Sequence, residues 1–140
     1  MTRYVIGPDV ALRLARDEVR LPGVHRLLAP TLLRSQVLAL LYQEVGSGAT
    51  TRTEAERQLD YLRALRIRLL GDRVLQRTAW KVADQLGWPD TFDAEYVALT
   101  QLQADALITL DPRLSAAVKE LVPTAPFEAL TNPAGPTNPE

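Results

Sequence analysis

The sequence predicts an α/β domain whose mostly parallel central sheet is covered by helices on both faces. Short apolar segments alternate with amphipathic stretches of helical length, which is the pattern of βαβ units. The chain has 140 residues, 46% of them hydrophobic, so we expect one domain of ordinary size with a proper core. We therefore predict a three-layer α/β/α domain over residues 1–130. The proline-rich residues 131–140 are expected to form a flexible tail.

The first half of the chain predicts two strands and two helices. Residues 3–6 form a short apolar run that a Gly-Pro pair ends, which predicts a buried strand followed by a helix from Asp9. Residues 25–29 are expected to form a short strand or a turn. Residues 31–45 carry leucines and valines three and four residues apart and end at Gly-Ser-Gly, which predicts a helix.

The middle of the chain predicts a peripheral helix, a strand and a second helix. Residues 51–65 have a charged face and a narrow apolar stripe, and Thr51 and Glu54 are spaced as a capping box. Residues 66–70 suit a short strand or an edge segment. Residues 72–86 show a helical apolar face, which includes a valine at position 74, and Gly-Trp-Pro ends them.

The last part of the chain predicts a helix, an inner strand and two further elements. Residues 91–102 are expected to be helical, and residues 105–109 (DALIT) are the clearest inner strand after the first one. Residues 111–122 begin with Asp-Pro, a common helix start, and predict the last helix. Residues 126–130 are expected to add a final edge strand.

Composition excludes several kinds of site. Lys plus Arg number 16 against 17 Asp plus Glu, so a nucleic-acid site would have to be a local patch. The absence of cysteine and the single His25 exclude disulfides and zinc sites built from thiolates or several histidines, and leave serine-triad chemistry without a good base. No 18-residue apolar run occurs, so we expect a soluble cytoplasmic protein with no membrane association. Carboxylates remain as the chemically interesting groups.

Three aspartates fall where a parallel sheet places its functional crevice, outside the carboxyl ends of the strands. Asp9 follows the first strand, Asp111 follows the DALIT strand, and Asp93 lies in the first turn of the helix that leads into that strand. Carboxylates without nitrogen or sulfur ligands suit a hard cation such as Mg²⁺ or Mn²⁺. Each aspartate also has an ordinary interpretation as a helix cap or an acidic first turn.

Several segments together resemble a known family. They are RYVIGPDV at residues 3–10, APTLLRSQVL at 29–38 and, most specifically, DAEYVALTQLQADALITLD at 93–111. Over about residues 3–130 the chain resembles the PIN domain, and more narrowly the VapC-type toxins of bacterial toxin–antitoxin pairs. The resemblance implies an endoribonuclease that uses Mg²⁺ or Mn²⁺, forms a homodimer and is inhibited by a cognate antitoxin.

The resemblance also implies a site with four carboxylate positions, two of which are retained. Asp93 and Asp111 match the family's carboxylates, and Thr109 matches its hydroxyl beside the metal site. The first-strand Asp position holds Gly7, and the helix Glu position holds Gln36. Because a glycine has no side chain and a glutamine is uncharged, the affinity for a metal should fall.

The partly degenerate site leaves alternatives open. One ion held by Asp93 and Asp111, with Asp9 as a candidate third ligand and Gln36 positioning a water, would support weakened RNA cleavage. A catalytically inactive PIN scaffold that acts through protein or RNA binding is the alternative. Whether Gly7 and Gln36 are natural or engineered also stays open.

RNA would need cationic contacts that position its phosphates. Single-stranded or loop RNA is the expected target, because its unstacked bases are open to readout. Five basic side chains are available, although a solvated surface is the ordinary interpretation of most of them: Arg13, Arg34, Arg66, Arg68 and Lys81.

Overall fold

The computed structural model describes residues 1–133, and the chain forms an α/β domain around one parallel sheet. Its strands are β1 (Arg3–Ile6), β2 (Arg26–Pro30), β3 (Ile67–Leu70) and β4 (Ala106–Ile108). The strand order is β3-β2-β1-β4, and each neighbouring pair is parallel. The predicted fold class is therefore confirmed. Of the predicted tail, residues 134–140 lie outside the described part of the chain.

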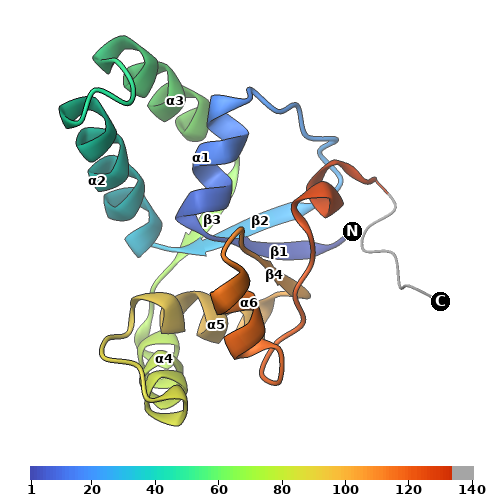
Figure 1. Ribbon diagram of the computed structural model, residues 1–140. Coiled ribbons are helices and arrows are strands. Elements are labelled where there is room, and N and C mark those ends of the chain that lie inside the picture. The colour runs from blue at the N-terminus through green and yellow to red at the C-terminus, as the bar shows by residue number, and fades with distance from the viewer. Residues whose placement is uncertain (134–140) are drawn as a thin grey trace.

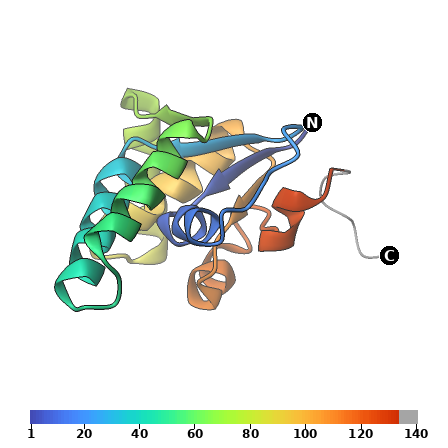
Figure 2. The ribbon, with the colours of Figure 1, turned by 90° about the horizontal axis from the view of Figure 1, so that it is seen from above.

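Helices cover both faces of the sheet and make the predicted three layers (Figure 1). One face carries α1 (Pro8–Arg16), α2 (Leu32–Gly46) and α3 (Arg52–Ala64). The other face carries α4 (Arg73–Leu86), α5 (Phe92–Gln103) and α6 (Pro112–Val118). A 3₁₀ helix, η1 (Phe127–Thr131), follows near the end of the described chain. Figure 2 shows it at the opposite end of the domain from α2 and α3. Within residues 1–133, no helix is both long and apolar enough to cross a membrane.

The core lies on both faces of the inner strands. The apolar side chains of β1 at residues 4–6 and of β4 at residues 106–108 are buried, which explains why both strands are continuous apolar runs. Helix α5 packs against β1, β2 and β4, and its residues 96–100 are buried. The buried hydroxyl of Thr100 donates to the carbonyl oxygen of Tyr96 at 2.8 Å, so burial leaves that hydroxyl satisfied.

Local sequence signals fix several helix ends. The Thr51 side chain accepts a hydrogen bond from the Glu54 amide at 3.1 Å, as the predicted capping box requires. Asp72 caps α4 in the same way by accepting from the Leu75 amide at 2.8 Å. Gly87 ends α4 with a φ of 66°, a left-handed conformation that glycine adopts without strain.

Three local predictions are wrong. Residues 126–130 do not form an edge strand: a 3₁₀ helix occupies 127–131, and a single bridge to the sheet, between Thr124 and Leu107, comes just before this segment. Helix α6 ends at Val118 rather than near residue 122, ahead of a proline that cannot continue a helix. Val74, expected on the buried face of α4, is 56% exposed.

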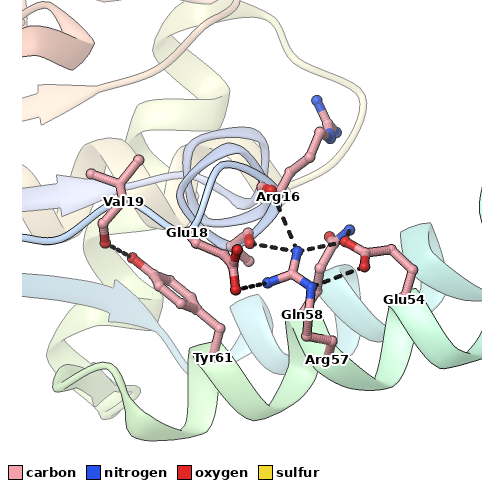
Figure 3. Close-up of polar contacts among 8 residues, drawn as sticks. Arg16, Glu18, Val19, Glu54, Arg57, Gln58 and Tyr61 are labelled. Carbon is pink, nitrogen blue, oxygen red and sulfur yellow. Dashed lines mark hydrogen bonds and ion pairs between the residues drawn. The ribbon is translucent and has the colours of Figure 1, made fainter.

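Arg57 of α3 holds the C-terminal end of α1 (Figure 3). Its guanidinium donates to the carbonyl oxygens of Ala15 at 3.0 Å and Arg16 at 3.4 Å, in the last turn of the helix, where carbonyl groups have no partner within the helix. The same group pairs with Glu54 and, at 3.1 Å, with Glu18. Arg57 thereby fixes α1, the helix that carries Asp9, against its neighbour.

We expect Arg57→Ala to lower the melting temperature more than Arg63→Ala does. Arg63 pairs with the exposed Asp60 and reaches no helix end, so it serves as a matched control. Hydrogen bonds from Arg57 and, to a smaller extent, from Gln58 lower the pKa of Glu54 to about 2. Because this folded-state pKa lies below the ordinary value of 4.5, the stabilisation is complete above 4.5 and is lost as the pH falls through about 2. Thermal denaturation should show the deficit of Arg57→Ala shrinking in acid. Equal melting temperatures for both variants at neutral pH would contradict the assignment.

Candidate active site

Three aspartates from separate parts of the chain converge at the carboxyl ends of β1 and β4. Asp9 lies in the first turn of α1, Asp93 in the first turn of α5, and Asp111 is the N-cap of α6. Strand β1 has β4 on one side and β2, to which it connects through α1, on the other. This is the point at which the strand order reverses, where open parallel sheets form their crevice.

The Asp9 carboxylate joins the start of α1 to the end of β4. Its Oδ2 accepts hydrogen bonds from the Leu110 amide at 2.9 Å and from the Thr109 hydroxyl at 3.2 Å, while Oδ1 accepts from the Val10 amide at 2.8 Å. The Thr109 oxygen also accepts from the Asp111 amide at 3.1 Å. Thr109 therefore lies between Asp9 and Asp111 and orients both segments.

Gly7 leaves room for the Asp9 carboxylate. The backbone of Gly7 is extended, with a φ of −82°, so its conformation does not require a glycine. A Cβ atom at this position would lie 2.8 Å from Asp9 Oδ1. The carboxylate of residue 9 thus occupies the space that a side chain of residue 7 would enter.

The Asp93 carboxyl lies near other negatively charged side chains. Partial burial raises the pKa of its carboxyl, and Asp90, Asp111 and Asp9 raise it further. Within residues 1–133, no side chain or amide donates a hydrogen bond to the Asp93 carboxylate. Asp111 has one oxygen, Oδ1, bound by the Arg113 amide at 2.9 Å. A cation between these groups would relieve their repulsion.

Gln36 is held by a tyrosine from α5. The Tyr96 hydroxyl donates to Gln36 Oε1 at 2.6 Å. Burial raises the pKa of Tyr96, and the charges of Glu95, Asp93 and Asp9 add to this, so the phenol stays protonated and acts as a donor. With its carbonyl oxygen engaged, Gln36 has its amide N–H groups left to offer, which bind a water or a phosphate oxygen rather than a cation.

The donor set consists of hard oxygens. Asp9, Asp93 and Asp111 supply carboxylates, and Mg²⁺ is often held by one or two of these, with water and substrate phosphates as the other ligands. Among residues 1–133, no three His, Cys, Asp or Glu side chains are grouped so that they could hold a metal ion by themselves. The site therefore fits an ion that the substrate helps to bind, and not a closed protein cage.

The structure separates the predicted cationic residues. Arg13 lines a cleft that also contains Thr109 and Asp111, whereas Arg34 lines an apolar groove between α2, α3 and β3. Sequence reasoning missed the contribution of Tyr96, although its position three residues after Asp93 places both on one side of α5. It also missed Phe127, for which the sequence carries no signal beyond its aromatic ring.

Comparison with solved structures finds a similar fold in the crystal structure of PAE2754 from Pyrobaculum aerophilum. The match has a TM-score of 0.69 and covers 93% of this chain and 94% of that chain, at 20% sequence identity. At this identity the likeness concerns the fold alone. No protein-family profile matches the sequence, and no curated protein is significantly similar to it.

Proposed function

We propose that this chain is a Mg²⁺- or Mn²⁺-dependent endoribonuclease of the PIN-domain, VapC-like type with a reduced acidic site. The observation that carries the proposal is the convergence of Asp9, Asp93 and Asp111 beside Thr109 at the carboxyl ends of β1 and β4. These are the positions at which the resemblance expects metal ligands, apart from Asp9. Single-stranded or loop RNA is the proposed substrate.

Asp9 takes the place of the missing first-strand carboxylate in this proposal. The resemblance expects an aspartate at position 7, where this chain has Gly7. Asp9 Oδ1 lies 2.8 Å from where the Cβ of such a residue would be, so a carboxylate reaches the end of β1 from two residues further along the chain. This supports three carboxylates in the site rather than two.

Each side chain of the site has a separate role in this proposal. Asp93 and Asp111 would hold one ion together with water and substrate phosphates, and Asp9 beside them is the candidate third ligand. When bound, Mg²⁺ or Mn²⁺ supplies Lewis-acid chemistry that lowers the pKa of water and offsets negative charge on the scissile phosphate. Thr109 keeps Asp9 in position through its hydroxyl, and the Gln36 amide donates to a water or a phosphate oxygen.

From the same resemblance we propose that the protein is a cytoplasmic homodimer and that an antitoxin inhibits it. Light scattering at micromolar concentration checks the dimer, and a monomer there would contradict it. A catalytically inactive scaffold is the second candidate function, and Gln36 favours it, because the oxygen at this family position is uncharged and already accepts a hydrogen bond from Tyr96.

A gain-of-function variant separates the two candidates. We expect Gln36→Glu to tighten Mg²⁺ binding in calorimetry and to raise cleavage of a panel of single-stranded and hairpin RNAs, because it restores a charged ligand beside the three aspartates. Gln43→Glu, which adds the same charge on the exposed surface of α2, is the matched control. Wild-type chain that cleaves no RNA with either metal, and a Gln36→Glu variant that gains neither binding nor cleavage, would refute the nuclease and favour the scaffold.

A further inference from the structure

A cleft adjoins the carboxylate site at Thr109 and Asp111. It has a volume of about 410 Å³ and is formed by Arg13 of α1, residues 109–112, Ser115 of α6 and residues 124–128. Thr109 and Asp111 thus belong both to the cleft and to the carboxylate site. A strand of RNA whose scissile phosphate lay at the aspartates would place a neighbouring nucleotide at this opening. The volume is in the range of about 300–1,000 Å³ that small-ligand pockets have.

Arg13 is fixed in this cleft by an aromatic ring. Its guanidinium carbon lies 4.1 Å from the centroid of the Phe127 ring, a cation–π contact. Its nearest carboxylate is that of Asp17, 3.8 Å from Nε, and the Arg13 side chain is 42% exposed. No residue in the range 1–133 accepts a hydrogen bond from Arg13. The planar group is therefore oriented by stacking while its N–H donors stay available, which is an arrangement suited to a phosphate.

The other side chains in the cleft favour a nucleotide over a free anion. Asp111 and Glu128 line it together with the single cation, so inorganic phosphate alone would meet two negative charges. A nucleotide brings ribose hydroxyls and base amino groups that can donate to carboxylates, besides its phosphate. The hydroxyls of Ser115 and Thr124 can bind either donors or acceptors.

We propose that this cleft binds the nucleotide next to the scissile phosphate of a single-stranded RNA, with Arg13 contacting its phosphate and Phe127 holding Arg13 in place. The proposal rests on the proposed function, and it names the strand's path beyond the aspartates. Arg13 acts in binding and takes no part in the bond-breaking step. Its loss should therefore weaken RNA binding with or without metal.

The test measures binding of a short, random-sequence, fluorescein-labelled single-stranded RNA by anisotropy, in EDTA and in Mg²⁺. We expect Arg13→Gln to raise Kd about tenfold, as the loss of a charged hydrogen bond predicts, and to reduce the slope of log Kd against log salt by about one. Arg16→Gln, an exposed arginine on the same helix outside the cleft, is the matched control and should change Kd little. Phe127→Leu should weaken binding less than Arg13→Gln, because the charge remains. Circular dichroism checks that each variant is folded.

Cleavage measured in parallel separates this proposal from the proposed function. If Arg13→Gln binds RNA like Arg16→Gln while the wild type cleaves, the cleft proposal is overturned and the nuclease stands. If the wild type cleaves nothing but Arg13→Gln still weakens binding relative to Arg16→Gln, the cleft stands and the nuclease fails. Absence of RNA binding by the wild type in both buffers would overturn both. If Arg13→Gln is unfolded, the variants Phe127→Leu and Arg13→Lys test the cleft proposal instead. Wild-type RNA affinity in both variants overturns the proposal, and weakened RNA binding in either variant supports it.

Discussion

Asp93→Asn should reduce Mg²⁺-dependent RNA cleavage about 100-fold or more. The loss of a residue that merely orients a metal ligand typically costs 10–100-fold, and Asp93 is proposed as a ligand itself. Asparagine keeps the shape of the side chain but removes the charge that a hard cation needs. Initial cleavage rates at saturating Mg²⁺, with wild type and variant at equal concentration, measure the effect.

The same substitution should stabilise the metal-free protein. Because partial burial and three nearby aspartates raise the pKa of Asp93 above its ordinary value of 3.8, the folded state binds this proton more tightly than the unfolded state does. Stability is therefore lost as the pH rises through the raised pKa, and Asp93→Asn should recover it at neutral pH but not in acid. The residue as a whole still has much of its surface exposed to solvent, so screening keeps the gain small. Thermal denaturation in EDTA at both pH values measures it.

Adding Mg²⁺ should make the wild type more stable than Asp93→Asn, the reverse of their order in EDTA. An ion that binds the folded state raises its melting temperature, and it should do so for the wild type more than for Asp93→Asn. Asp84→Asn, on the exposed surface of α4, is the control and should respond to Mg²⁺ like the wild type. Full cleavage by Asp93→Asn, or an equal Mg²⁺ response in all three proteins, would be incompatible with Asp93 as a ligand.

Gly7→Ala should destabilise the protein and weaken Mg²⁺ binding together, although its backbone tolerates alanine. The new Cβ would lie 2.8 Å from Asp9 Oδ1, so the carboxylate has to shift, which disturbs the hydrogen bond that Oδ1 accepts from Val10 and those that Oδ2 accepts from Thr109 and Leu110. Loss of these bonds costs about 1–3 kcal/mol. Denaturant unfolding and calorimetric Mg²⁺ titration of the same samples measure the two effects.

A double-mutant cycle isolates the cause of this effect. Once Asp9→Ala has removed the carboxylate, Gly7→Ala should become stabilising by about 0.4–1 kcal/mol, because alanine reduces the entropy of the unfolded chain. Gly46→Ala, where an added Cβ meets nothing within 4 Å, is the control and should stabilise in both backgrounds. If Gly7→Ala changed the stability by the same sign and size with and without Asp9→Ala, the Asp9 carboxylate would not occupy the space of a side chain at position 7.

Moving the carboxylate back to position 7 tests its function. We expect the combination of Gly7→Asp and Asp9→Ala to bind Mg²⁺ and cleave RNA at least as well as the wild type, whereas Asp9→Ala alone loses both. Gly7→Asp alone should gain little, because two carboxylates would compete for one space. An inactive combination that folds normally would show that Asp9 acts as a structural link between α1 and β4.

Most of the fold follows from local patterns in the sequence. The apolar runs of β1 and β4, the Thr51 cap and the end of α4 at Gly87 each depend on neighbours within a few residues, and the structure confirms these predictions. Residues 127–131 were misassigned because a short apolar stretch suits a strand and a 3₁₀ turn equally well.

The sequence by itself determined that three aspartates follow or precede strands of one parallel sheet, because strand ends and helix starts are set by local spacing. Tertiary structure decided which side-chain oxygens of the site already accept hydrogen bonds from the protein. Asp9 binds an amide 101 positions away and Gln36 a phenol 60 positions away, and packing of the whole domain sets such contacts. Arg13 on the ring of Phe127 is a third case, since no periodicity links a residue of the first helix to the end of the chain.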